Sequence, residues 1–177
     1  MKIYTKQGDT GTTSVYSKTI LKVNKDDAII ECYGTLDELN AQLGLIAALL
    51  QQEENSLQAW ASHIQTCQQH IFAVGFALSD EDKLSPESIQ TLEQHIDAMQ
   101  SALPPQTSFI LPGGSVLSAH LHIARTVARR GERALVTASH HHATSTLALA
   151  YINRLSDFLF VLARTCNFVH EIEDIKV

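Results

Sequence analysis

The stretch SFILPGGSVLSAHLHIARTVARRGER, residues 108–133, places a Gly-Gly turn directly before a long helical pattern. On a wheel of about 100° per residue, one narrow polar stripe carries Ser118, Arg125, Arg129 and Glu132, flanked by His122 and Arg133. Apolar residues lie on two sides of this stripe, which predicts a helix that is buried on more than one side. Because charges are costly to bury without partners, the stripe indicates a cavity or interface that receives an anion. A solvated face with ion pairs inside the helix is an equally weighted alternative.

Helical spacing extends outward from this stretch in both directions. Apolar residues predict helices over residues 35–52, 55–78 and 145–169, a helix that starts at Pro86, and a start near Gly114 for the opening stretch. Thr35 and Glu38 fit a capping box at the start of the first helix. Residues 2–34 favour an extended arm with turns at Gly8 and Gly11. The sequence therefore predicts an all-α bundle of five helices in a single domain, residues 1–177, with an arm over 1–34 and the bundle over 35–170.

The composition favours a globular protein and disfavours nucleic-acid-binding, disulfide-rich and membrane proteins. A chain of 177 residues that is 45% apolar suits one globular domain, and a net charge of -6 disfavours nucleic-acid binding. Cys32, Cys67 and Cys166 are odd in number and widely spaced, so we expect core thiols in a reducing compartment. The N-terminus lacks the apolar segment of a signal peptide, and no apolar run approaches about 18 residues. We therefore expect a cytoplasmic protein with no membrane partner.

A second polar stripe lies on the predicted last helix, and its members are Asn153, Asp157, Arg164 and Asn167. An aspartate on one helix can hold an arginine from another, which leaves the remaining guanidinium groups to bind phosphate oxygens. Asp37, predicted in the first helical turn, is a further candidate, although favourable charge placement at a helix start explains it equally well.

The arm contains a candidate anion-binding loop. Residues 6–13, KQGDTGTT, combine glycines, hydroxyl groups and a lysine, which are the components of a backbone nest for anions. The loop lacks the spacing of a Walker A motif, and an ordinary turn is the alternative reading.

Other classes of site find little support in the residue spacing. A ferritin-like di-iron site needs Glu-x-x-His pairs, and the sequence has none. The run His140 to His142 suits either a metal site or, more simply, a solvated connection between helices. The residues by themselves thus indicate a helical bundle that binds a polyphosphate.

Five motifs in order add a family resemblance. They are KIYTKQGDTGTTS, KVNKDD followed by ECYGTLDELNAQLG, FILPGGS, LHIARTVARRGER and YINRLSDFLFVLAR. Together they span nearly the whole chain, which resembles the PduO-type ATP:cob(I)alamin adenosyltransferases. The resemblance implies a ferritin-like, cobalamin adenosyltransferase-like bundle of five helices that forms a homotrimer with active sites between subunits.

The resemblance also implies the reaction and its residues. The 5′-deoxyadenosyl group of MgATP would pass to the cobalt of cob(I)alamin or a related corrinoid, with release of triphosphate. A flavin reductase or a cobalamin-dependent enzyme would be a further partner. Mg²⁺ would arrive with ATP, and no metal site of the protein itself is implied. The implied ATP-binding residues are Thr5, Lys6, Gly8, Asp9, Gly11, Thr13, Lys25, Arg129, Glu132 and Asn153. Asp37 and Arg125 would pair across the subunit interface, and Phe109 would cover the lower face of the corrin.

Some positions depart from the family pattern. Ile29 and Lys22 stand where arginine is usual, and Gly131 stands where alanine is usual. The chain also ends soon after the last helix, so we expect no tail contribution to closing the corrinoid site. These departures keep a second hypothesis open, in which the protein binds ATP or a corrinoid as a carrier or regulator without turnover.

Overall fold

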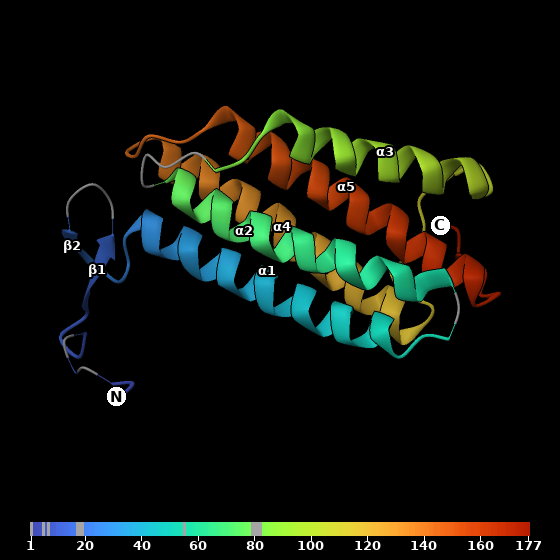
Figure 1. The fold of residues 1–177 in the computed structure, drawn as a ribbon, viewed down its shortest axis with the longest axis horizontal. Helices are drawn as coiled ribbons and strands as arrows, with labels where there is room; N and C mark the ends of the chain where they lie inside the picture. The colour runs from blue at the N-terminus through green and yellow to red at the C-terminus, as the bar shows by residue number, and fades with distance from the viewer. Residues whose placement is uncertain (1, 5, 7, 17–19, 55, 79–82) are drawn as a thin grey trace.

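A bundle of long helices follows an N-terminal hairpin in the computed structural model, which describes residues 2–4, 6, 8–16, 20–54, 56–78 and 83–177. The elements within those ranges are β1 (Thr12–Tyr16), β2 (Ile20–Asn24), α1 (Ala28–Gln51), α2 (Trp60–Ala77), α3 (Pro86–Ala102), α4 (Val116–Ser139) and α5 (Thr146–Val169) (Figure 1). A 3-10 turn over Ser56–Ala59 leads into α2. The predicted all-α class with five helices is confirmed, and the sheet consists of one antiparallel strand pair.

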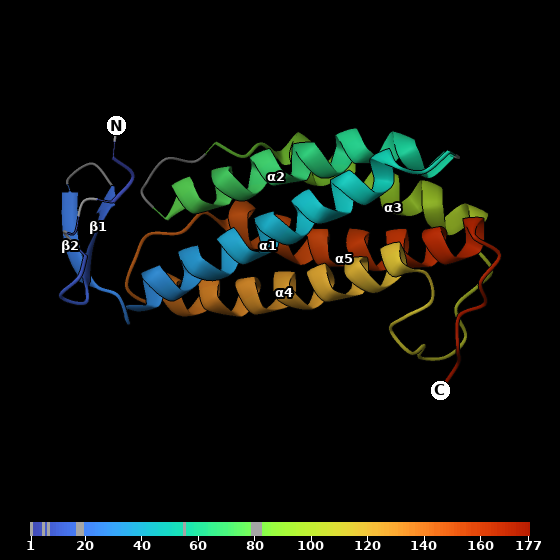
Figure 2. The same ribbon diagram turned by 90° about the horizontal axis from the view of Figure 1, so that it is seen from below.

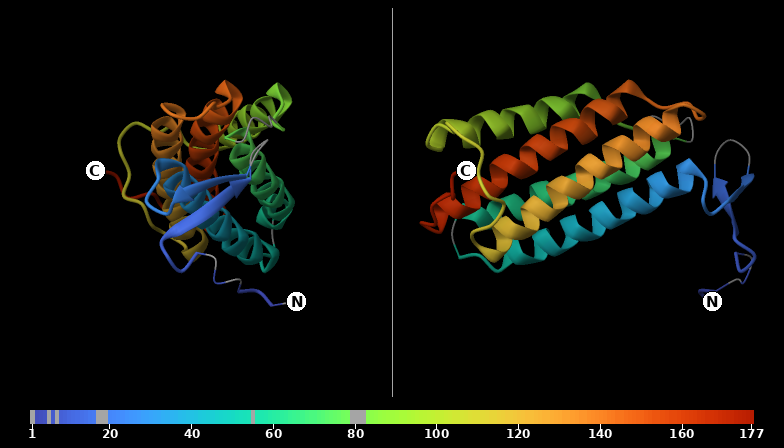
Figure 3. Two further views of the ribbon diagram at one scale, coloured as in Figure 1. Left: turned by 90° about the vertical axis from the view of Figure 1, so that its left-hand side faces the viewer. Right: turned by 180° about the vertical axis from the view of Figure 1, so that it is seen from behind.

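The helices pack in a defined order around the bundle. α1 packs against α2 and α4 (Figure 2), α4 packs against α5, and α3 lies on the outer side of α5 (Figure 1). The hairpin projects from the end of the bundle where α1 begins, whereas the linker between α3 and α4 lies at the opposite end (Figure 3). One chain therefore holds its arm and the Phe109 linker far apart.

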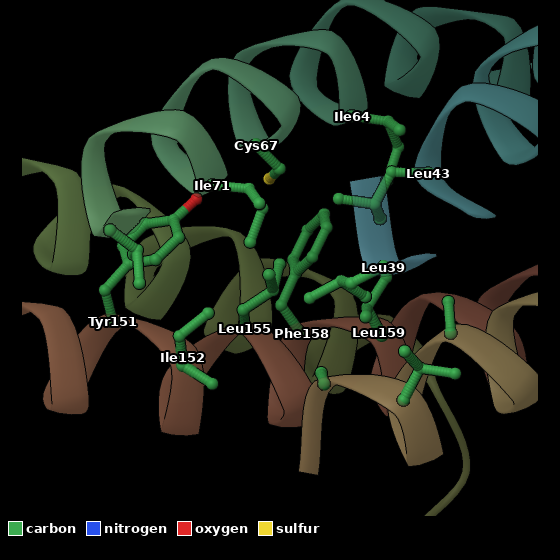
Figure 4. Packing of buried hydrophobic residues seen from close by; sticks show 14 of the residues in the cluster. Leu39, Leu43, Ile64, Cys67, Ile71, Tyr151, Ile152, Leu155, Phe158 and Leu159 are labelled. Carbon is green, nitrogen blue, oxygen red and sulfur yellow. The ribbon is translucent and has the colours of Figure 1, made fainter. Parts of the chain in front are cut away.

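The core is built from apolar side chains that three helices direct into the bundle interior. Phe158 and Leu155 of α5 meet Leu39 of α1 and Ile64 of α2, and each of these four side chains is fully buried (Figure 4). The hydroxyl of Tyr151 lies 3.1 Å from His70 Nδ1, so this buried phenol has a polar partner. Dense packing of α5 against its neighbours fixes the direction of its polar face.

The predicted start of the first helix is wrong. α1 begins at Ala28, where the side chain of Asp27 accepts a hydrogen bond from the Ile29 amide at 3.0 Å. Thr35 is instead a buried residue inside the helix, and its hydroxyl donates to the carbonyl of Glu31 at 2.9 Å. The arm therefore ends before residue 28, and Asp37 lies in the third turn of α1 rather than in its first.

The turn before α4 depends on a glycine. Gly114 has a φ of +100°, and a Cβ placed there would lie 2.2 Å from Asn167 Oδ1. No L side chain fits this position without displacing Asn167. Ser115 then caps α4 by accepting a hydrogen bond from the Ser118 amide at 3.1 Å. The Gly-Gly turn thus directs the chain from the linker into the helix that bears the arginines.

Three further expectations concern the cysteines, the buried sides of α4 and the absence of a membrane-spanning segment. The three cysteines are free and buried, as expected, and burial raises the pKa of Cys32 and Cys166 to about 12. Of the apolar residues beside the polar stripe of α4, which the wheel predicted to be buried, Ile123 is 46% exposed. By length and mean hydropathy, α5 could span a membrane, although the sequence pattern did not indicate this. Its residues are mostly buried within the bundle, as in the core helices of soluble proteins.

Gly131 leads to a stability prediction. A Cβ at this position would meet Thr35 and Leu36 of α1 at 3.6 and 3.7 Å, which is ordinary contact. Gly131→Ala should therefore raise the free energy of unfolding by about 0.5–1 kcal/mol, because alanine costs less backbone entropy in a helix. Thermal denaturation should show a Tm increase of roughly 1–4 °C. Gly34→Ala, which has no described atom within 4 Å of its new Cβ, measures the propensity gain alone. If Tm fell for Gly131→Ala but not for Gly34→Ala, the conclusion that a Cβ fits at position 131 would be wrong.

Candidate active site

A hollow of about 690 Å³ lies between α3, α4, α5 and the linker that precedes α4. It brings Phe109 and two arginines of the stretch 108–133 together with Asp157 of the second polar stripe. Phe109 and Ile110 come from the linker, and the lining also includes His122, Arg125, Arg129, Glu93, Asp97, Arg154, Asp157 and Phe160. Phe109 is 84% exposed, so its ring is available to a ligand. The structure thus places Phe109 beside two of the predicted arginines.

Arg125 and Arg129 give this hollow a positive wall. They lie one helical turn apart on α4, and the pKa of Arg125 is lowered by burial and by the charge of Arg129. The Nε of Arg125 is buried without a hydrogen-bond partner in the described part of the chain. Neither arginine forms an ion pair with any described carboxylate. Two neighbouring guanidinium groups that lack counter-ions are suited to bind an anion.

His122 lies deeper in the same hollow, one turn before Arg125. It is 3% exposed, and both ring nitrogens are buried without a described hydrogen-bond partner. Burial and the nearby charge of Arg125 lower the pKa of His122, which keeps the imidazole neutral. His122 therefore adds no positive charge to the wall, which belongs to Arg125 and Arg129.

An ion network that the sequence did not reveal forms the opposite wall. Arg154 donates through Nε to Glu93 of α3 at 3.0 Å and through Nη1 to Asp157 at 2.7 Å. This network ties α3 to α5 beside the hollow. Asp157 was a candidate from its helical face, but Arg154 and Glu93 were not. A sequence gives no sign that a residue of α3 will face α5, so the pairing could not be predicted from it.

Glu132 of α4 and Asn153 of α5, which the resemblance assigns to ATP, lie next to each other. The amide Nδ2 of Asn153 donates to Glu132 Oε1 at 2.7 Å, which joins α4 to α5. Asn153 is exposed and Glu132 is half-buried, so both side chains are accessible. Glu132 lies on the same helix as Arg129, three residues further along.

Asp37 occupies a different hollow from Arg125. This second hollow, of about 370 Å³, lies between α1, α2 and β1, and its lining includes Tyr33, Phe72 and Phe76. Phe72 is 63% exposed, and Asp37 has no ion pair with a described residue. The structure therefore does not bring Asp37 and Arg125 together within one chain.

The predicted arm residues gather around a turn before the hairpin. The amide of Gly11 donates to the carbonyl of Gly8 at 3.2 Å, and the amide of Lys25 donates to the carbonyl of Gly11 at 2.9 Å. A Cβ on Gly8 would lie 3.3 Å from the Lys25 ammonium, so this lysine passes closely over the turn. Lys6 has a φ of 60° and Asp9 is exposed beside the turn. The turn therefore assembles a cation and glycine amides at one end of the bundle.

The other described arm residue with a predicted ATP contact and two of the positions that depart from the family pattern lie on the hairpin and on α1. Thr13 lies within β1 opposite Val23, whereas Thr5 falls outside the described residues. Ile29 is 3% exposed and belongs to the core, so the position of the usual family arginine contributes no charge here. Lys22 lies on β2 opposite Ser14, and it is exposed.

Two residues of the predicted polar stripe on α5 hold other parts of the chain. Arg164 is 9% exposed and donates to Asp174 Oδ2 at 2.8 Å, and Asn167 donates to the carbonyl of Gly113 at 3.0 Å. Their sequence spacing correctly placed them on one face, but that face is turned toward the linker. Among the histidines of the α4–α5 loop, His142 lies 3.8 Å from Asp27. No described group of three or more His, Cys, Asp or Glu residues is arranged to hold a metal ion.

Comparison with known proteins shows which family the chain resembles. The family model for cobalamin adenosyltransferase matches residues 3–166. A corrinoid adenosyltransferase of Bacillus subtilis (strain 168) is 38% identical over 181 residues, which cover 99% of this chain and 92% of that protein. The corrinoid adenosyltransferase PduO of Citrobacter freundii is 40% identical over 173 residues, and the chain spans 49% of its length.

A solved structure is similar over its full length. It is a variant of the PduO-type ATP:corrinoid adenosyltransferase from Lactobacillus reuteri complexed with cobalamin and ATP. The TM-score is 0.88 at 34% sequence identity, and the match covers 99% of this chain and 96% of that chain. With the family model and these relatives in agreement, the chain belongs to the cobalamin adenosyltransferase family.

Proposed function

We propose that the protein transfers the 5′-deoxyadenosyl group of ATP to the cobalt of cob(I)alamin or a related corrinoid. The observation that carries this proposal is the hollow in which Phe109 faces the same space as Arg125 and Arg129. An exposed aromatic ring suits the flat apolar face of a corrin, and two arginines that pair with no described carboxylate suit anionic groups. Family membership supports the same activity.

The reaction requires a single substitution at carbon. Cob(I)alamin attacks C5′ of ATP with the electron pair of its cobalt, the cobalt–carbon bond forms, and the C5′–O5′ bond breaks. The leaving group is triphosphate, on which negative charge develops. The charge of Arg129 would stabilise that charge at the α4 wall, and the fixed helix would hold it without reorganisation during the reaction.

ATP would be held by the arm together with α4 and α5. The Lys25 ammonium, which passes closely over the turn from Gly8 to Gly11, offers a cation to the phosphates. Glu132 and Asn153 supply oxygen atoms next to Arg129, and hard cations such as Mg²⁺ prefer oxygen ligands. Mg²⁺ bound to the triphosphate supplies charge neutralisation. Thr5, Lys6, Asp9 and Thr13 complete the proposed ATP contacts.

We further propose a homotrimer in which each active site lies between two subunits. Asp37 and Arg125 line different hollows and make no ion pair with any described residue, and a partner subunit would bring the two together. The exposed Phe72 and Phe76 beside Asp37 supply apolar surface for such an interface. The separation of the arm from the Phe109 linker in one chain also favours a site shared by two chains.

The other parts of the proposal concern the chain as a whole. The arm and the bundle would act as one catalytic domain, because residues of both are needed for ATP. A cytoplasmic location agrees with three buried, unoxidised cysteines. A flavin reductase or a cobalamin-dependent enzyme would deliver or receive the corrinoid, and we propose neither nucleic acid nor a membrane as a partner.

An anaerobic adenosylation assay tests this function against the carrier hypothesis. The protein is incubated with MgATP and chemically reduced cobalamin, and adenosylcobalamin is measured by its visible spectrum and by chromatography. We expect product in proportion to enzyme concentration, with triphosphate formed in equal amount. If product stays at the level of the reaction without enzyme while calorimetry detects ATP binding, the carrier hypothesis is correct instead.

A further inference from the structure

The segment that carries Phe109 pairs with the C-terminal residues of the chain. The amide of Val177 donates to the carbonyl of Phe109 at 2.9 Å, and the amide of Leu111 donates to the carbonyl of Ile175 at 2.9 Å. These bonds flank an isolated antiparallel bridge. Although the sequence predicts no contribution from a tail, this short strap reaches the corrin-facing residue through its backbone.

A buried ion pair anchors the strap to α5. Asp174 accepts from Arg164 Nε at 2.8 Å through one carboxylate oxygen and lies 3.3 Å from Asn167 Nδ2 through the other. The side chains of Arg164 and Asp174 are only 10% and 18% exposed. A charge-assisted contact at this depth is weakly screened by solvent, so it fixes where the strap begins.

The same two α5 residues hold both ends of the linker. Arg164 Nη2 donates to the carbonyl of Pro104 at 3.1 Å, near the start of the linker. At its end, Asn167 donates to Gly113 at 3.0 Å and accepts from the Ser115 amide at 3.0 Å. The linker is thus fixed at its two ends by α5 and near its middle by the strap.

We propose that Asp174 is a positioning residue for Phe109. The Phe109 side chain is 84% exposed, so packing of its own ring does not hold it in place. Its direction follows from the backbone, and the backbone between the fixed ends is held by the strap that Asp174 anchors. Without the carboxylate, Arg164 loses its counter-ion and the strap loses its only side-chain ion pair among the described residues. This inference rests on the proposed function, in which Phe109 covers the lower face of the corrin.

The variant Asp174→Ala tests the role, with Glu173→Ala as its matched control. Glu173 is an exposed carboxylate that makes no ion pair with any described residue. For Asp174→Ala we expect kcat with cob(II)alamin and a reductant to fall about tenfold or more, because a displaced contact residue costs rate even when the chemistry is intact. Electron paramagnetic resonance should show a matching loss of four-coordinate cob(II)alamin. With chemically prepared cob(I)alamin the change should stay within about threefold, because Phe109 is proposed to act before the transfer step.

A second variant and a measurement without substrate complete the test. Removal of residues 175–177 deletes the backbone pairing but keeps Asp174, and it should reproduce the selective loss with cob(II)alamin. Hydrogen exchange at the Leu111 amide should quicken at least about tenfold in Asp174→Ala and stay unchanged in Glu173→Ala. Unchanged exchange in Asp174→Ala, or faster exchange with normal cob(II)alamin turnover, overturns the positioning role. Absence of product from the unaltered protein with cob(I)alamin instead contradicts the proposed function, and the exchange result does not depend on it.

Discussion

Asp37→Ala and Arg125→Ala should each lower kcat/KM for the corrinoid by about a hundred- to a thousandfold. Each substitution would leave one charge of the proposed intersubunit pair without its partner, and removing one member of a buried pair typically costs about 3–5 kcal/mol. A loss of about 1.4 kcal/mol corresponds to a tenfold change in rate. Affinity for ATP, measured by calorimetry, should change much less, because the proposed ATP contacts lie on the arm and around Arg129.

The two inactive variants should restore each other when they are co-expressed and assemble into mixed trimers. A site is intact when one subunit supplies Asp37 and its neighbour supplies Arg125, which random mixing achieves in about a quarter of sites. Activity should therefore recover to about a quarter of the unaltered level. The variants purified separately and mixed without subunit exchange serve as the control. Trimers by light scattering that regain no activity would show that the two residues do not share a site across the interface.

Phe109→Ala should lower turnover of cob(II)alamin with a reductant by about ten- to a hundredfold. The side chain is 84% exposed in the unliganded chain, so the corrin itself would bury it. Burial of a phenylalanine side chain is worth about 1.5–3 kcal/mol, and that energy would favour the corrinoid without its lower axial ligand. Removing that ligand makes the cobalt easier to reduce, so the reduction step should lose most.

Two readouts separate this role from a general defect. Four-coordinate cob(II)alamin should disappear from the paramagnetic resonance spectrum of Phe109→Ala with ATP, while chemically prepared cob(I)alamin should still be adenosylated. Phe168→Ala is the matched control, because Phe168 is 52% exposed and does not line the hollow of Phe109. Normal cob(II)alamin turnover in Phe109→Ala would count against the assigned role.

The sequence predicted helix positions best where a residue's own backbone preference, or the spacing of apolar residues, sets where a helix begins or ends. Pro86 predicted the start of α3 because its ring suits the first turn, and the apolar spacing of 145–169 predicted α5 within one residue of its ends. The capping box at Thr35 was a wrong prediction, because a short local pattern can occur in more than one place in a helix. A Thr-x-x-Glu pattern also occurs inside a helix, where the threonine hydroxyl bonds to the preceding turn, and Asp27 offered an earlier cap.

For the candidate site, the sequence predicted which residues share a helix face but not which residues they contact. The stripe on α4 correctly grouped Arg125 with Arg129, because residues one turn apart must share a face. The α5 stripe correctly grouped Arg164 with Asn167, but the spacing did not show that both residues hold the linker and the strap. Helical spacing gives the relative angle between side chains and not the neighbour that they face.

The sequence by itself determined the helical class, the polar faces of α4 and α5, and the family to which the stretch 108–133 points. Periodicity and backbone preference are local properties, so they can be read from the order of residues. Only the tertiary structure decided that Asp37 and Arg125 occupy separate hollows, that Arg154 joins α3 to α5, and that Asp174 anchors a strap on the Phe109 segment. Those contacts join residues distant in the chain, and their partners are selected by how the helices pack together.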